Sequence, residues 1–214
     1  MNQYERIPGT LDYTGQEASL LLHISDVCNA AFARYGYERV VLPILERSDI
    51  FLQRSGEEIR RRMYILQDPS GREMCLRPEM TISAARAFLG SMSARRLPVR
   101  LSYLGEVFRY DKVREGRYRQ FLQAGVENIG SKNQLAADVE IVTLALEILR
   151  KLGITDFRLV FGDLELTTEF INSLPVSAGV RQKLLENFWR RDAFELILER
   201  FAKPVASEES AGGA

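Results

Sequence analysis

Residues that bind metals or form disulfides are scarce in this chain, which holds two cysteines and one histidine among 214 residues. Cys28 and Cys75 stand in apolar surroundings, as small buried hydrophobic residues do, and a disulfide framework is not expected. A zinc site or a serine–histidine triad would depend on His23 alone, and His23 lies in an apolar helical pattern. We therefore expect no metal site and no cofactor.

An excess of basic residues is also missing, because 29 lysines and arginines balance 29 aspartates and glutamates. Proteins that hold nucleic acid through its phosphates usually carry such an excess, so a large nucleic-acid surface is not expected, although a local patch stays open. The arginine triplet at 60–62 is more typical of a solvated helix end. No apolar run reaches membrane-spanning length and the N-terminus shows no signal sequence, so we expect a cytoplasmic protein without a membrane partner.

Helical and strand-like patterns alternate along the chain. Apolar residues at helical spacing predict helices at 16–35, 82–89, 134–152, 164–174, 179–188 and 193–201. Runs of β-forming residues predict strands at 39–42, 63–66, 73–76, 101–109, 121–129 and 157–161. This order predicts an α+β fold, with an antiparallel β-sheet flanked by helices. We expect one domain over residues 1–202 and a disordered tail at 203–214.

A long hairpin over residues 100–130 carries the first set of candidate site residues. Its two β-rich runs are joined by a charged loop that contains Gly116. Arg109 lies on the outgoing strand, and a spacing of four residues keeps Gln123 and Glu127 on one face of the returning strand. An arginine, an amide and a carboxylate on one face suit a small polar ligand. The alternative is a solvated face with an ion pair.

Two further polar residues, Glu79 and Thr81, stand where the predicted strand 73–76 leads into the helix at 82–89. At such a junction a carboxylate and a hydroxyl can face a cleft. Capping of the helix by Thr81, with Glu79 in its first turn, explains the pattern equally well. Both interpretations of this junction therefore stay open.

Five segments of the chain resemble the catalytic core of class II histidyl-tRNA synthetases. Segment 36–43 resembles the class II motif that supports dimerisation, and segment 76–81 resembles the family's Leu-Arg-Pro-Glu-x-Thr segment. The other three resemble the second class II motif, with its outgoing strand at 101–110, its loop tip at 116–121 and its return strand at 123–127. The resemblance extends from about residue 7 to about residue 165 and implies a class II synthetase-like core.

The resemblance also implies roles for both sets of polar residues. It aligns five of them with residues that bind histidine in the synthetase, namely Glu79, Thr81, Arg109, Gln123 and Glu127. Arg109 also aligns with the arginine that contacts the α-phosphate of ATP and the substrate carboxylate. The chemistry agrees, because carboxylates can hold an ammonium or imidazolium group and an arginine can hold a carboxylate through two hydrogen bonds. L-histidine is therefore the expected ligand.

The C-terminal side of the sequence departs from the synthetase. Segments 162–189 and 193–197 look instead like its paralogue, the regulatory subunit of ATP phosphoribosyltransferase in histidine biosynthesis. The third class II motif, of the form Gly-x-Gly-x-Gly-x-Glu-Arg, is not found, and no anticodon-binding domain follows. The core therefore looks truncated on its C-terminal side, and without half of the nucleotide site we expect no aminoacylation by this chain.

Together these features favour a non-catalytic regulatory subunit, needed for the first step of histidine biosynthesis and for feedback sensing of histidine. The resemblance implies a homodimer within a hetero-oligomer, bound to the short-form catalytic ATP phosphoribosyltransferase subunit, with no catalytic residue of its own. One alternative is a histidyl-tRNA synthetase fragment that activates histidine with ATP. Another is an orphan class II-like fold used as an interaction module. A third class II motif in an extended reading frame would favour the synthetase.

Overall fold

The computed structural model describes residues 4–202, except for the side chains of residues 53–58. The chain divides after Asp156 into two compact units. The sequence predicts one domain over 1–202, and the extent of that domain stays a prediction, while the tail predicted at 203–214 lies outside the described residues. Within the described residues, no helix is long and apolar enough to cross a membrane.

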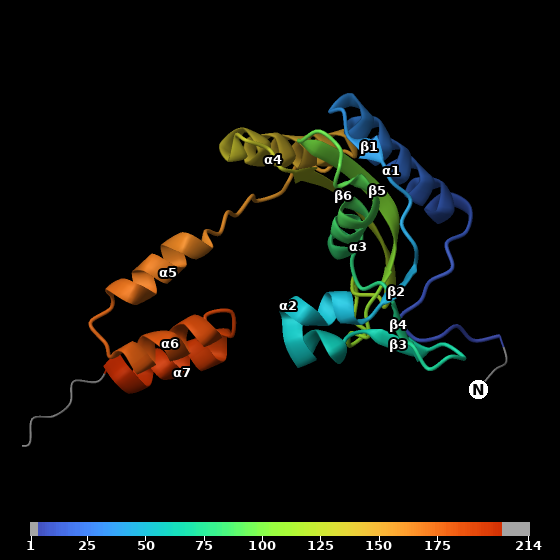
Figure 1. Ribbon diagram of the computed structural model, residues 1–214. Helices are drawn as coiled ribbons and strands as arrows, with labels where there is room; N and C mark the ends of the chain where they lie inside the picture. The colour runs from blue at the N-terminus through green and yellow to red at the C-terminus, as the bar shows by residue number, and fades with distance from the viewer. Residues whose placement is uncertain (1–3, 203–214) are drawn as a thin grey trace, which may run out of the picture. The chain divides into compact units, whose positions relative to one another are not determined.

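The main sheet of the first unit has three strands in the order β1-β5-β6 (Figure 1). β5 (Val99–Phe108) and β6 (Gln120–Ile129) pair antiparallel along their whole length, as the long predicted hairpin requires. β1 (Glu38–Arg39) joins β5 in parallel and is shorter than the strand predicted at 39–42. Pro43 follows it, and a proline has no backbone N–H with which to continue a ladder.

The register of the β5–β6 hairpin decides which side chains share a face. Gln123 lies opposite Gly105, and Glu127 lies opposite Leu101. Tyr103 is between these two positions on β5, and successive side chains of a strand point to opposite faces. Gln123, Glu127 and Tyr103 therefore occupy the same face of the sheet.

Helices cover both faces of this sheet (Figure 1). α1 (Gly15–Arg34) and α4 (Gln134–Lys151) pack on one face, around the core residues Cys28, Ala31, Phe32, Tyr37 and Leu144. α3 (Thr81–Ala87), which continues into the π-helical turn η1 (Phe88–Met92), packs on the other face, around the core residues Leu42, Met80, Ala84, Tyr103 and Val107. The face covered by α3 is the one that carries the predicted polar residues.

A second, smaller sheet of the first unit is fully antiparallel, with the order β2-β4-β3. β3 (Tyr64–Gln67) and β4 (Glu73–Leu76) form the predicted short hairpin. β2 (Leu45–Arg47) was not predicted, because three residues that begin two positions after Pro43 leave too short a pattern. α2 (Asp49–Arg60) packs against this sheet, around the core residues Phe51, Met63 and Cys75.

The second unit is helical and contains α5 (Leu164–Ser173), α6 (Ala178–Asn187) and α7 (Arg191–Ala202). These helices confirm the three predicted for this part of the chain, and they enclose a small core of Ile171, Val180 and Leu184. The side chain of Asp163 accepts hydrogen bonds from the first backbone N–H groups of α5, and Ser177 does the same for α6.

The strand predicted at 157–161 is wrong. These residues form no regular element, and Val160 and Phe161 are exposed by 76% and 72%. Their apolar residues, with Arg158 as the one polar residue among them, suit a strand, but a strand also needs a neighbour for its backbone groups, and none pairs with this segment in the described chain. The fold class itself is confirmed as α+β, with antiparallel strand pairs and flanking helices.

Candidate active site

The turn between β4 and α3 forms one wall of the candidate site. Glu79 lies in this turn, and its two carboxylate oxygens accept hydrogen bonds from the backbone N–H groups of Thr81 (2.7 Å) and Ile82 (2.8 Å). The helix start is therefore capped, but by Glu79, which precedes α3, and not by Thr81, which is the first residue of the helix. A carboxylate at a helix start also meets the positive end of the helix dipole. Each oxygen keeps a second lone pair with which it can accept from a ligand.

Arg77 fastens this turn to the main sheet. Its Nε donates to the backbone oxygen of Glu106 (2.8 Å), and its Nη1 donates to those of Leu42 (2.7 Å) and Pro43 (3.1 Å). Arg77 is 4% exposed, and burial lowers its pKa. The guanidinium group thereby joins three chain segments and fixes the position of the following residues, 78–81.

A chain of hydrogen bonds crosses the sheet face from Thr81 to Glu127. The Tyr103 hydroxyl donates to Oε1 of Glu127 (2.9 Å) and is 3.1 Å from the Thr81 hydroxyl oxygen. Since a hydroxyl has a single hydrogen, the Thr81 hydroxyl is the donor in the second contact. Burial raises the pKa of Tyr103, so its hydroxyl keeps its proton and holds the Glu127 carboxylate in place.

Gln123 fixes the same turn from β6. Its Oε1 accepts a hydrogen bond from the backbone N–H of Met80 (2.9 Å), at the start of α3. With the oxygen engaged, the amide nitrogen keeps two hydrogens to donate. Gln123 thus presents a donor on the face where Glu127 presents an acceptor.

Arg109 enters the site just beyond the end of β5. Its Nε donates to the backbone oxygen of Pro78 (2.8 Å), and its guanidinium carbon lies 5.1 Å from the centre of the Phe121 ring. No hydrogen bond to either Nη atom and no ion pair with Glu127 is found in the described part of the chain. Burial, followed by the nearby charge of Arg62, lowers the pKa of Arg109. The ion pair that would have explained Arg109 and Glu127 without a ligand is therefore not formed.

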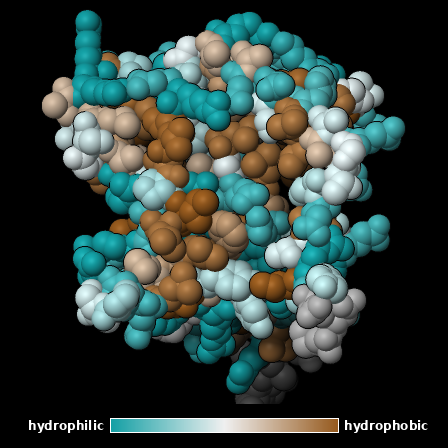
Figure 2. All heavy atoms as spheres, turned by 90° about the vertical axis from the view of Figure 1, so that its right-hand side faces the viewer, coloured by the Kyte–Doolittle hydropathy of each residue, from teal (hydrophilic) through white to brown (hydrophobic). Residues whose placement is uncertain are grey.

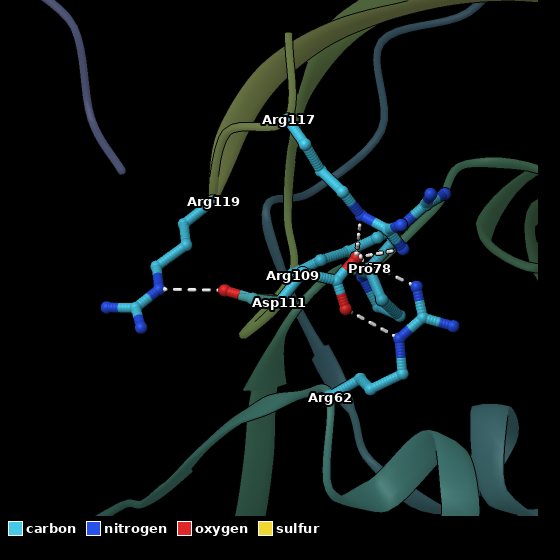
Figure 3. Close-up of polar contacts among 6 residues, drawn as sticks. All are labelled: Arg62, Pro78, Arg109, Asp111, Arg117 and Arg119. Atoms are coloured by element: carbon cyan, nitrogen blue, oxygen red, sulfur yellow. Dashed lines mark hydrogen bonds and ion pairs between the residues drawn. The ribbon is translucent and has the colours of Figure 1, made fainter. Parts of the chain in front are cut away.

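Beside Arg109, Asp111 gathers three more arginines (Figure 3). Its carboxylate accepts two hydrogen bonds from Arg62 (2.7 and 2.9 Å) and two from Arg117 (3.1 and 2.8 Å). The Nε of Arg119 donates to its backbone oxygen (3.2 Å). Hydrogen bonding from Arg62 and Arg117 lowers the pKa of Asp111 to about 2.

Two hollows adjoin these groups. The larger, of about 540 Å³, contains Thr81, Tyr103 and Glu127 together with apolar residues of α1, α4 and β6. The smaller, of about 220 Å³, is lined by Arg109, Asp111, Gly116, Arg117, Tyr118 and Phe121. The first suits the partly apolar, partly cationic side chain of an amino acid, and the second suits an anion.

The five predicted site residues all surround the 78–82 turn. Thr81 is linked through Tyr103 to Glu127, Gln123 binds the turn directly, and Glu79 and Pro78 belong to it. Sequence reasoning did not assign roles to two participants. Tyr103 stands in an alternating apolar strand and so resembles core, and Asp111 belongs to a charged loop tip in which no single charge is distinctive.

The fold, in which a parallel strand lies beside an antiparallel hairpin that carries Arg109 and Glu127, is similar to the catalytic core of class II aminoacyl-tRNA synthetases. The model of the histidyl-tRNA synthetase family matches residues 9–209. The chain therefore belongs to the histidyl-tRNA synthetase family.

Curated relatives carry the name histidine–tRNA ligase. The chain is 40% identical to that of Sulfurisphaera tokodaii over 190 residues and 38% identical to that of Sulfolobus acidocaldarius over 186 residues. Each alignment covers 86% of this chain and 43% of the relative, so the chain spans less than half of the length of these ligases. Among solved structures, a histidine–tRNA ligase subunit from Alicyclobacillus acidocaldarius superposes with a TM-score of 0.76 at 26% identity, covering 96% of this chain and 60% of that one.

The interpretation as a non-catalytic regulatory subunit is wrong, because relatives at 36–40% identity are ligases, which are enzymes. A Bacillus halodurans structure described as an ATP phosphoribosyltransferase regulatory subunit/histidyl-tRNA synthetase has a TM-score of 0.67 at 23% identity, which shows the shared fold alone. The prediction depended on the likeness of segments 162–189 and 193–197 to that subunit and on the missing third motif. In a chain that spans 43% of its relatives, that absence does not separate a regulatory protein from a ligase.

Proposed function

We propose that this chain carries the amino-acid-binding and α-phosphate-binding part of a histidine–tRNA ligase active site. The observation that carries the proposal is the hydrogen-bonded series Thr81, Tyr103 and Glu127 along a hollow of about 540 Å³. It is supported by membership of the family and by the names of the curated relatives.

L-histidine would meet a complementary charge at each end. Tyr103 occupies Oε1 of Glu127, and Oε2 remains to accept from the ammonium group or the imidazole ring. The amide nitrogen of Gln123 can donate to the ligand from the same strand. Arg109 can bind the carboxylate through its Nη groups, because its Nε alone is used within the described structure.

Activation of histidine would follow from this placement. A histidine carboxylate oxygen attacks the α-phosphorus of ATP, the bond to the bridging oxygen breaks, and pyrophosphate leaves with histidyl-adenylate as the product. Negative charge gathers on the α-phosphate oxygens in the transition state, and Arg109 is held where its guanidinium can stabilise that charge.

Calorimetric titration of L-histidine into wild type and Glu127→Gln tests this proposal. The variant keeps the size of the side chain and removes the charge, so we expect a loss of about 1.5 to 3 kcal/mol, or roughly ten- to a hundredfold in affinity. Glu106→Gln is the matched control, since Glu106 lies on β5 but on the opposite face, where it accepts from Gln120 (2.8 Å). A melting curve on each variant verifies folding.

Equal histidine affinity for wild type and Glu127→Gln would contradict the proposal. The polar face would then be a retained feature without a ligand. A loss of histidine affinity of similar size in Glu106→Gln would show that the titration responds to the net charge of the protein and not to this site.

We also propose that segment 40–45, which follows β1 and includes the first residue of β2, is part of a homodimer interface. Val41 is 89% exposed and Leu45 is 50% exposed, and apolar patches gather on the side of the first unit along which this segment runs (Figures 1 and 2). Replacing both residues with lysine should give monomers in sedimentation experiments. Unchanged sedimentation of a folded double variant would count against the interface.

A further inference from the structure

Residues 7–10 form a tight turn, the N-terminal turn, which lies against the base of the β5–β6 loop. The backbone N–H of Thr10 donates to the oxygen of Ile7 (3.1 Å), and the Thr10 hydroxyl donates to the same oxygen (2.8 Å). Pro8 at the second position and Gly9, with a φ of +89°, at the third are the residues that a type II turn favours. The local sequence therefore fixes the shape of the N-terminal turn.

Arg119 holds the N-terminal turn against the loop. Its backbone N–H donates to the oxygen of Gly9 (2.8 Å), and its Nη1 donates to the oxygen of Pro8 (3.3 Å). Its Nε donates to the backbone oxygen of Asp111 (3.2 Å; Figure 3), and its guanidinium carbon lies 4.3 Å from the centre of the Tyr110 ring. Arg119 thereby joins two segments that are 111 positions apart along the chain.

The same residue connects the N-terminal turn with Arg109, the arginine assigned to the ligand carboxylate. The backbone oxygen of Arg119 accepts from the N–H of Arg109 (2.8 Å). Two consecutive backbone hydrogen bonds therefore lead from Gly9 through Arg119 to Arg109, just beyond Phe108 and Gln120, the last paired residues of β5 and β6. A displacement of Arg119 would move the backbone from which the Arg109 side chain extends.

The contact between Gly9 and Arg119 leaves no room for a side chain at position 9. A Cβ atom there would lie 2.8 Å from Cγ and 2.9 Å from Cδ of Arg119, and 2.9 Å from Cγ2 of Val113. Such a contact forces a shift, because carbon atoms pack best at about 3.5 to 4.0 Å. Cγ and Cδ of Arg119 are not a loose end, since the backbone holds one side of them and the contacts of the guanidinium group hold the other.

We propose that Gly9 and Arg119 are positioning residues for Arg109, and through Arg109 for the carboxylate of the amino-acid ligand. This inference rests on the proposed function, because it concerns the same histidine site. In this arrangement neither Gly9 nor Arg119 touches the ligand. Both act by holding the backbone of Arg109, since a binding group must stay within about 0.5 Å of its productive position.

A purely structural role of the N-terminal turn predicts a different outcome. If the turn only stabilised the fold, Gly9→Ala would lower the free energy of unfolding and leave the preference between ligands unchanged. If the turn positions Arg109, the same variant should lose affinity only for a ligand that carries a carboxylate. L-histidinol separates the two cases, because a hydroxymethyl group replaces the carboxylate of histidine while the amino group and the imidazole ring remain.

The experiment titrates L-histidine and L-histidinol into the purified protein by calorimetry. We expect wild type to bind histidine at least about tenfold more tightly than histidinol, because the analogue lacks the charge-assisted bonds to Arg109. In Gly9→Ala we expect the affinity for histidine to fall about tenfold and the affinity for histidinol to stay within about twofold of wild type.

Gly71→Ala is the matched control. Gly71 also has a positive φ, of +82°, but a Cβ atom there meets open space. Alanine is strained at both positions, so the control carries the backbone strain without a displaced arginine. We expect both affinities to be unchanged in Gly71→Ala.

Arg119→Lys approaches the same link from the other side and keeps the inference testable if Gly9→Ala does not fold. The lysine keeps the positive charge and loses the Nε donor and the planar group, so we expect the same selective loss of histidine affinity. The Arg109 N–H should also exchange its hydrogen faster in both single variants. The double variant should lose less than the product of the two single effects, because both changes disturb one link.

Four results would overturn the inference and leave the histidine site standing. They are unchanged histidine affinity in Gly9→Ala, equal losses for histidine and histidinol, a selective loss of the same size in Gly71→Ala, and a full product of effects in the double variant. Wild type that binds both ligands equally would remove Arg109 from the carboxylate, and the inference with it. Wild type that binds no histidine would overturn this inference and the proposed function together.

Discussion

Arg77 and Arg109 differ sharply in how their guanidinium groups are bonded, although both are held by backbone oxygens near the β4–α3 turn. Arg77 donates to three backbone oxygens from two separate segments and is 4% exposed. Arg109 donates to one backbone oxygen, that of Pro78, and lies beside a hollow. Burial lowers the pKa of both residues, so burial alone does not distinguish them.

The difference shows how a structural arginine can be told from a ligand-binding one. A guanidinium group has five N–H donors, and the fold uses those of Arg77 to join its own segments. The fold uses the Nε of Arg109 to aim the group and leaves its Nη groups for a ligand. The state of hydrogen bonding, and not the residue type, therefore indicates the role.

The largest expected effect follows from replacing Arg77. Arg77→Leu would leave three backbone oxygens, those of Leu42, Pro43 and Glu106, without their donor in a buried place. We expect the free energy of unfolding to fall by about 3 kcal/mol or more. Chemical unfolding measures it, with Arg95→Leu as the control, because Arg95 forms an exposed ion pair with Glu38. An equal loss of unfolding free energy in both variants would contradict the structural role of Arg77.

Replacing Arg109 should have the opposite outcome. Arg109→Lys keeps the charge but loses the planar fork, so we expect the affinity for L-histidine to fall about tenfold or more. The free energy of unfolding should change by less than about 1 kcal/mol, since one hydrogen bond is lost. Arg114→Lys, in the exposed part of the same loop, is the control. A large loss of unfolding free energy with unchanged affinity for histidine would show that Arg109 has a structural role like that of Arg77.

A smaller effect is expected at Gly125, which lies opposite Tyr103 in the sheet. A Cβ atom there would lie 2.6 Å from the Tyr103 ring and hydroxyl, so Gly125→Ala must displace the hydroxyl from Glu127. We expect a cost of about 1 to 3 kcal/mol in stability and a several-fold loss of histidine affinity. Gly90→Ala is the control, because a Cβ at Gly90 meets open space. Unchanged histidine affinity would show that Tyr103 does not hold Glu127 for a ligand.

The sequence predicted elements whose signal is local. The β5–β6 hairpin follows from alternation on both sides of a glycine-containing loop, and α4 follows from its apolar stripe. Segment 157–161 also carries a local signal, a short run of β-forming residues, yet it forms no strand, because such a run does not specify a pairing partner. Residue spacing placed Gln123 and Glu127 on one face, which the register confirms.

The contacts that complete the site could not be predicted, because they join residues distant in sequence. Tyr103 meets Glu127 only through the strand register, and Asp111 meets Arg62 across 49 positions. The sequence favoured neither of two interpretations of the Glu79 junction, helix capping or a carboxylate that faces a cleft. In the structure the Glu79 oxygens bind the first backbone N–H groups of α3. The membership of the family came from motifs, but the choice between its two branches was made wrongly on a motif that the chain does not contain.

The smallest expected effect is a pH dependence at Asp111. Its pKa is about 2 in the folded protein, below the ordinary value of 3.8, because Arg62 and Arg117 stabilise the charged form. A lowered pKa in the folded state adds stability above the unfolded pKa, and that stability is lost as the pH falls from about 4 towards 2. The side chains of Arg62 and Arg117 are exposed by 41% and 44%, so solvent screening reduces the contribution to about 1 kcal/mol.

The pH effect is measured as the difference in unfolding free energy between wild type and Asp111→Asn. We expect this difference to be constant from about pH 5 to pH 8 and to fall to about half of that value at pH 3, where the unfolded chain already binds the proton. Chemical unfolding at pH 7, 5 and 3 provides the measurement. A difference that persists undiminished at pH 3 would mean that the Asp111 side chain stabilises the loop through its shape and neutral hydrogen bonds. The ionised carboxylate would then not be what holds the arginines beside Arg109.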